Sequence, residues 1–168
     1  MTQKVLPNRH LEKYTSHKNK MTKRLLIFFS TGFFIGYIPF APGTFGTLIG
    51  LVLLFLVSKL SVDTQIILFI IYFFISYVSI KVAVEHFKKS DPPEVVCDEI
   101  LGIWVTLILF EINFKTLLLG FILFRVFDII KPFPIRYIDH KLKNALGVIL
   151  DDIIAGLIAK GIIWLILK

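Results

Sequence analysis

The feature that most constrains the fold of this chain is a run from Leu25 to Ser58 that contains no charged residue. A second long apolar run, Ile66–Val84, suffices for one helical membrane span, which needs about 20 residues. Hydrophobic residues make up 56% of the chain, whereas typical soluble domains contain roughly 45–50%. The runs lack the strict alternation expected of strands that cross a bilayer. The sequence therefore predicts an all-α fold, a small polytopic helical bundle embedded in a membrane.

Some of these helices are expected to be broken or re-entrant. Prolines and glycines interrupt the uncharged run at 39–47, and its flanks, Leu25–Ile38 and Phe45–Leu60, are each short for a full span. The flanks fit either a re-entrant pair or two tilted spans that meet at the break. Three further apolar runs predict helices in the second half: Ile100–Phe110, Thr116–Phe124 and Ala145–Leu167.

The positive charge of the chain is concentrated at its N-terminus. The formal net charge is +7, and residues 1–24 contribute +6 of it, from seven Lys/Arg and one Glu. We therefore divide the chain into a basic polar tail, 1–24, and a membrane-embedded helical catalytic domain, 25–168. A basic segment that leads directly into an apolar one is typical of a cytoplasmic flank, so we expect the N-terminus in the cytoplasm and no binding of nucleic acid.

A cluster of charges lies inside the apolar second half of the chain. Arg125, Asp128 and Lys131 are spaced three apart, so on a helix they share one face. Pro132 is expected to end that helix and to push Lys131 toward an extended conformation. With Arg136 just beyond, these cations suit a phosphate ester, because arginine binds phosphate bidentately and lysine adds a point charge. The alternative is a structural ion pair between Arg125 and Asp128.

Two acidic pairs are each followed by a glycine. Asp98-Glu99 precedes Gly102, and Asp151-Asp152 precedes Gly156, so each glycine lies four residues after an aspartate and on its helix face. A second helix or a ligand can then approach the carboxylate closely. Hard oxygen ligands of this kind suit Mg²⁺. For Asp98 and Glu99 alone, a favourable interaction with the helix dipole explains the acidic pair equally well. It does not explain Asp151 and Asp152, which have apolar neighbours on both sides.

The break in the first apolar run is a weaker candidate for an anion site. Its glycines stand beside an expected helix start, with Thr44 or Thr47 as the N-cap residue. Free backbone amides there, at Gly43 and Thr44, would bind an anion. A simple Pro-Gly turn explains the same residues.

These motifs together resemble the phosphatidylglycerophosphatase A family of bacterial membrane enzymes. The resemblance covers residues from about 39 to 156 and rests on four blocks: Pro42-Gly43-Thr44-Phe45-Gly46, Asp98-Glu99-Ile100-Leu101-Gly102, Arg125-Val126-Phe127-Asp128-Ile129-Ile130-Lys131-Pro132-Phe133-Pro134-Ile135, and Asp151-Asp152-Ile153-Ile154-Ala155-Gly156. Thr47 stands where the family pattern has a serine, and the hydroxyl is kept. The basic tail lies outside the resemblance.

The resemblance implies a multi-pass enzyme of the bacterial cytoplasmic membrane. Such an enzyme uses Mg²⁺ to remove the terminal phosphate of a phospholipid substrate, phosphatidylglycerophosphate, and leaves phosphatidylglycerol. On this basis we expect Asp98, Asp128, Asp151 and Asp152 around the metal, and Glu99 as a ligand or base. Arg125, Lys131 and Arg136 would hold the phosphate, together with Gly43 and Thr44.

A rival hypothesis from another class is a small cation-binding membrane transport protein. Carboxylates beside glycines in apolar helices also coordinate transported ions. The cations at 125, 131 and 136 argue against it, because a cation pathway would not place them beside its carboxylates.

Overall fold

The computed structural model describes residues 9–168, and side chains from residue 19 onward. The described residues form helices and no strand, which confirms the predicted all-α class. The elements are α1 (Arg9–Ser30), η1 (Ile35–Tyr37), α2 (Pro42–Val57), α3 (Val62–Phe87), α4 (Cys97–Leu107), α5 (Phe114–Ile130), α6 (Ile135–Lys141) and α7 (Ala145–Leu167).

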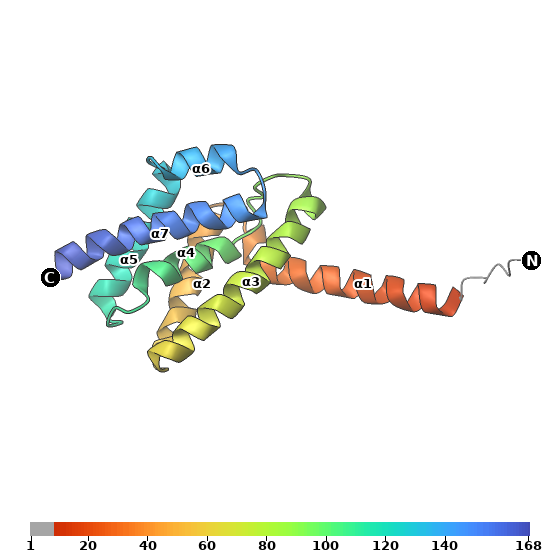
Figure 1. Cartoon of the computed structure of the whole chain (residues 1–168), viewed down its shortest axis with the longest axis horizontal. Helices are drawn as coiled ribbons and strands as arrows, with labels where there is room; N and C mark the ends of the chain where they lie inside the picture. The colour runs from red at the N-terminus through yellow and green to blue at the C-terminus, as the bar shows by residue number, and fades with distance from the viewer. Residues whose placement is uncertain (1–8) are drawn as a thin grey trace, which may run out of the picture.

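Helix α4 is the centre of the bundle. Ten of its eleven residues are buried, although it is among the shortest helices. It packs against α2, α3, α5 and α7, which surround it in Figure 1. Leu54 of α2, Phe124 of α5 and Ile163 of α7 meet Ile103 and Leu107 of α4 in the main core. Residues on α4 are therefore held by packing from several sides.

Polar side chains set the starts of three helices. Ser61 accepts a hydrogen bond from the backbone N–H of Thr64 at the start of α3. Asn113 forms a reciprocal capping box at the start of α5. Asn144 accepts from two backbone N–H groups at the start of α7. Each cap satisfies backbone donors that a helix start leaves unpaired, so residues at the boundary itself determine where these helices begin.

The break predicted in the first apolar run is present. Helix α1 runs through the expected tail boundary at 24/25 and ends at Ser30, after which Gly32, Phe33 and Phe34 have positive φ. Helix α2 then begins at Pro42. The prediction that Thr44 or Thr47 is its N-cap is wrong, because Ala41 occupies that position and the Thr47 hydroxyl donates to the carbonyl of Gly43. Proline is favourable at the first helical position, so no side-chain cap is needed there.

The end of α5 also differs from expectation. Helix α5 ends at Ile130, as Pro132 requires, but Lys131 is left-handed, with φ 45° and ψ 59°. The prediction of an extended Lys131 is therefore wrong. A left-handed conformation costs a residue with a side chain about 1–2 kcal/mol. The backbone N–H of Lys131 offsets part of this cost by donating to the carbonyl of Phe127 at 2.9 Å, which closes the last turn of the helix.

The outer surface of the bundle is unusually apolar. Large hydrophobic side chains are exposed along four helices, including Val52, Phe55, Ile67, Phe74, Ile122, Ile129 and Leu165. Among the described helices, α3 is the one long and apolar enough to cross a membrane by length and composition, and only 22% of its most apolar window is buried. Exposed apolar side chains in this number are typical of a surface that contacts lipid or a partner.

Candidate active site

A cavity of about 230 Å³ lies where the start of α4 meets the start of α2, the end of α5 and the first half of α7. We call it the acidic cavity, because six carboxylates and only two cations line it. Its charged lining residues are Asp91, Asp98, Glu99, Asp128, Asp151 and Asp152, with Arg125 and Lys131. The three sequence blocks that carry acids thus meet at one place.

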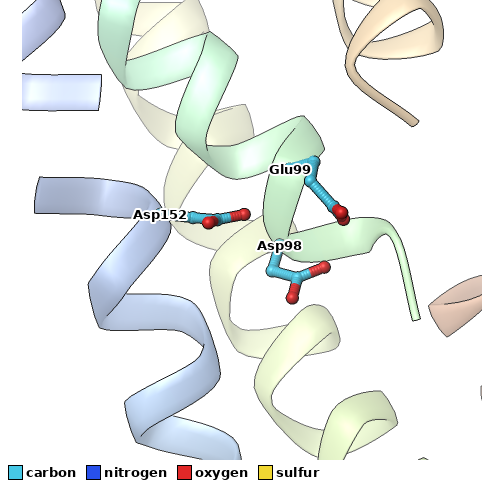
Figure 2. Close-up of side chains that lie close together, drawn as sticks. All are labelled: Asp98, Glu99 and Asp152. Carbon is cyan, nitrogen blue, oxygen red and sulfur yellow. The ribbon is translucent and has the colours of Figure 1, made fainter. Parts of the chain in front are cut away.

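Three of the carboxylates form a tight cluster. Asp98 and Glu99 come from the first turn of α4 and Asp152 from α7, and one oxygen of each lies within 4.8 Å of the others (Figure 2). Asp98 and Asp152 are buried, and Glu99 is half-buried. Asp98 Oδ1, Glu99 Oε2 and Asp152 Oδ2 are buried without a hydrogen-bond partner. Buried anionic oxygens without donors are costly, so this cluster suits a bound divalent cation.

Two glycines bring these acids together. A Cβ atom on Gly102 would lie 3.0 Å from the backbone oxygen of Asp152, and one on Gly156 would lie 3.1 Å from the Thr106 hydroxyl oxygen. The glycine of each acidic motif therefore packs against the other helix of the pair. The prediction that these glycines allow a close approach to the carboxylates is confirmed. Each acidic motif is approached closely by the helix that carries the other acidic motif.

The other two predicted metal ligands are paired with cations. Asp128 forms an ion pair with Arg125, which was the structural alternative considered for this segment. Asp151 forms an ion pair with Lys131, which also lies 3.5 Å from Asp139 of α6. Each pair places one cation at the wall of the acidic cavity beside the carboxylate cluster.

The ion pairs keep Lys131 charged. Burial alone would lower the pKa of its ammonium group, but the hydrogen bond and charge of Asp151, with the further charge of Asp139, raise that pKa well above its ordinary value. Lys131 therefore carries its positive charge at neutral pH, which suits a ligand of a phosphate group.

Gly43 places the start of α2 against the same cluster. A Cβ atom on Gly43 would overlap the Glu99 carboxylate and would lie 3.1 Å from a terminal nitrogen of Arg125. Gly43 lines the acidic cavity, together with Ala41 and Pro42. The positive end of the α2 dipole is therefore directed at the cavity, where it favours an anion.

The structure does not bring every predicted site residue to the cavity. Thr44 is half-buried and Arg136 is exposed, and both lie outside the cavity lining. Conversely, Asp91 lines the cavity and Asp139 contacts Lys131, although the sequence reasoning assigned neither to the site. The Asp91-Pro92-Pro93 segment resembled an ordinary exposed loop. The rigid Pro-Pro segment that directly follows Asp91, five to six residues before Asp98, is the one signal that could have indicated its role.

Comparison with known proteins places the chain in a family. A family model described as phosphatidylglycerophosphatase A matches residues 28–167, which include every residue of the acidic cavity. The chain belongs to the phosphatidylglycerophosphatase A family. Members of this family are phosphatases, so the acidic cavity belongs to an enzyme. No solved structure matches the chain.

Two relatives show the extent of the similarity. A phosphatidylglycerophosphatase A of Haemophilus influenzae is 35% identical over 139 residues, which cover 82% of this chain and 85% of the relative. A phosphatidylglycerophosphatase A of Escherichia coli is 30% identical over 138 residues, which cover 82% of this chain and 80% of the relative. The similarity to family members therefore spans nearly the whole helical bundle.

Proposed function

We propose that this protein is a Mg²⁺-dependent phosphatidylglycerophosphatase, which hydrolyses the terminal phosphate of phosphatidylglycerophosphate to give phosphatidylglycerol. The observation that carries the proposal is the acidic cavity. It holds three clustered carboxylates with unpaired oxygens beside two cations that are fixed by ion pairs. The names of the relatives supply the substrate, and the cavity supplies chemistry that fits it.

The charge of the cavity supports a metal requirement. With six carboxylates against two cations, a phosphate monoester would be repelled unless a further cation were bound. Asp98, Glu99 and Asp152 offer the hard oxygen ligands that Mg²⁺ takes, and they would hold it. When bound, the ion supplies charge neutralisation of the phosphate and a lowered pKa for the attacking water.

The remaining residues bind and orient the phosphate. Arg125 and Lys131 donate hydrogen bonds to its oxygens, and Asp128 and Asp151 hold these two cations in position. Gly43 adds the positive end of α2. In the reaction the water oxygen bonds to phosphorus, the bond from phosphorus to the glycerol oxygen breaks, and that oxygen takes up a proton. A carboxylate of the cluster accepts the proton that water loses.

The acidic cavity also fits a position at the cytoplasmic surface of a multi-pass protein in the bacterial cytoplasmic membrane. The end of α3 and the start of α7 lie at the end of the bundle from which α1 projects, and α6 lies along the adjoining side (Figure 1). Exposed Lys20, Lys23 and Arg24 of α1 would lie in the cytoplasm by the positive-inside rule. A charged phosphate headgroup stays at the interface, so a site at this end can reach it while the apolar helix faces contact lipid.

The test is phosphate release from phosphatidylglycerophosphate by the purified protein in detergent, with Mg²⁺ or with a chelator. We expect turnover that requires Mg²⁺. It should fall about 10²- to 10³-fold in Asp152→Asn, in line with the loss of a preorganised electrostatic group. The control is Asp63→Asn, an exposed acid in the first turn of α3, which should match the wild type. Full activity in chelator would refute the metal assignment, and no hydrolysis by the wild type would refute the substrate.

The transport hypothesis is less well supported by this geometry. A pathway for cations would have to pass Arg125 and Lys131, which line the same cavity as the carboxylates. The enzyme hypothesis gives a role to the clustered acids and to both cations of the lining.

A further inference from the structure

A second cavity adjoins the acidic cavity and has no role in the chemistry described so far. We call it the side cavity. It measures about 270 Å³ and shares Pro42 and Pro93 with the acidic cavity, so the two have a common wall. Its remaining lining residues are Gly36, Tyr37, Ile38, Pro39 and Glu94. The η1 turn and the segment before α4 thus border a half-open space of mixed polarity directly beside the phosphate site.

Glu94 presents an unsatisfied acceptor in this lining. Its Oε1 lies 3.5 Å from Lys89 Nζ, whereas its Oε2 is buried and has no hydrogen-bond partner. Leaving a buried acceptor unpaired costs about 1–3 kcal/mol, and more when the group is charged. An ionised carboxylate can only accept hydrogen bonds, so the group that satisfies Oε2 must be a donor such as a hydroxyl.

Tight backbone packing holds Glu94 in place. A Cβ atom on Gly36 would overlap the backbone carbonyl of Glu94, so η1 can lie against this segment only because residue 36 is a glycine. Gly36 is buried. Glu94 is therefore held on a rigid support, as a residue that selects a ligand by hydrogen bonding requires.

We propose that the side cavity binds the alcohol part of the lipid headgroup and that Glu94 accepts a hydrogen bond from its free hydroxyl. This inference rests on the proposed function. With the reacting phosphate in the acidic cavity, the glycerol unit on the other side of the breaking bond has to occupy adjoining space. That unit carries one free hydroxyl on its central carbon, and its short carbon chain suits the apolar side chains of Ile38 and Pro39. Glu94 is then a specificity residue for the leaving group.

The experiment compares two substrates on each enzyme variant. One is phosphatidylglycerophosphate, and the other is its analogue in which hydrogen replaces the headgroup hydroxyl. For the wild type we expect kcat/KM to be about 10- to 100-fold lower with the analogue, the range for a hydrogen bond to a charged group. For Glu94→Ala we expect nearly equal values for both substrates. Glu94→Gln should keep part of the preference, because its amide oxygen still accepts a hydrogen bond.

The ratio of the two kcat/KM values is independent of the fraction of folded enzyme, so partial misfolding of a variant cancels. The matched control is Glu111→Gln, an exposed acid just beyond the other end of α4, which should keep the wild-type ratio. An unchanged ratio in Glu94→Ala, or equal values in the wild type, would overturn the subsite while leaving the phosphatase proposal intact. Hydrolysis of neither substrate by the wild type would overturn both.

Discussion

The crossing of α4 and α7 gives the sharpest test of how the bundle builds its site. Gly156 lies one turn after Asp152, and Gly102 lies one turn after Asp98. We predict that Gly156→Ala weakens both the fold and the activity. The matched control is Gly161→Ala on the same helix, because a Cβ atom there would have nothing within 4 Å.

The magnitude follows from the space available at each glycine. A Cβ atom on Gly156 would lie 3.3 Å from the carbonyl carbon of Gly102 and about 1 Å closer to its oxygen than ordinary contact allows. Because that neighbour is backbone, the overlap is relieved only when the two helices separate. Overpacking of this kind costs about 1–3 kcal/mol. Gly161→Ala should instead be neutral or stabilising by up to about 1 kcal/mol, because alanine favours a helix more than glycine does.

Gly156→Ala should affect turnover more strongly than a loss of about 1–3 kcal/mol in the free energy of unfolding would suggest by itself. A separation near 1 Å moves Asp152 away from Asp98 and Glu99, and a misplacement of that size can reduce turnover about 100-fold. Thermal unfolding followed by circular dichroism in detergent measures the first effect, and phosphate release from phosphatidylglycerophosphate measures the second. If Gly156→Ala matched Gly161→Ala in both assays, the close crossing would not be what sets the carboxylate cluster.

Two further predictions concern the end of α5 and the orientation in the membrane. Lys131→Met should lower kcat/KM about 100-fold, because it removes a phosphate ligand and leaves Asp151 without its partner. Lys131→Arg keeps the positive charge and should therefore keep more activity. An equal loss of activity in both variants would contradict a role for the charge. The second variant is Arg136→Cys in a Cys97→Ala background, which has no other cysteine. Because residue 136 is exposed on α6, its thiol should react with a membrane-impermeant reagent only from the cytoplasmic side. Labelling only from the outer side would refute the proposed topology.

Much of the fold could be read from the sequence because the relevant signals are local. Apolar runs predicted the helices, and α3 matches the run Ile66–Val84 with a few added residues at each end. Pro132 ended α5 close to where the sequence indicated, because proline cannot continue a helix whatever surrounds it. The acid-and-glycine spacing also predicted close helix contacts, since both residues lie on one helix face.

The roles of the individual charged residues depended on tertiary structure. Sequence spacing could not show that Asp152 joins Asp98 and Glu99, whereas its neighbour Asp151 turns to Lys131. Adjacent helix residues point about 100° apart, so which one meets a distant helix depends on where the helices cross. That crossing results from core contacts spread over the whole chain.

The same reason explains the residues that were placed incorrectly or missed. Nothing local to Arg136 indicates that α6 carries it away from the cavity, and the prolines after Asp91 indicate a rigid loop without showing that it borders the cavity. The left-handed Lys131 is likewise adopted against local preference, because its ion pairs across to α6 and α7 hold it there. The sequence by itself determined that this chain forms apolar helices with acids and cations at their breaks. Only the packing around α4 decided which of those charges face one another, because the position of each helix determines which groups its side chains can contact.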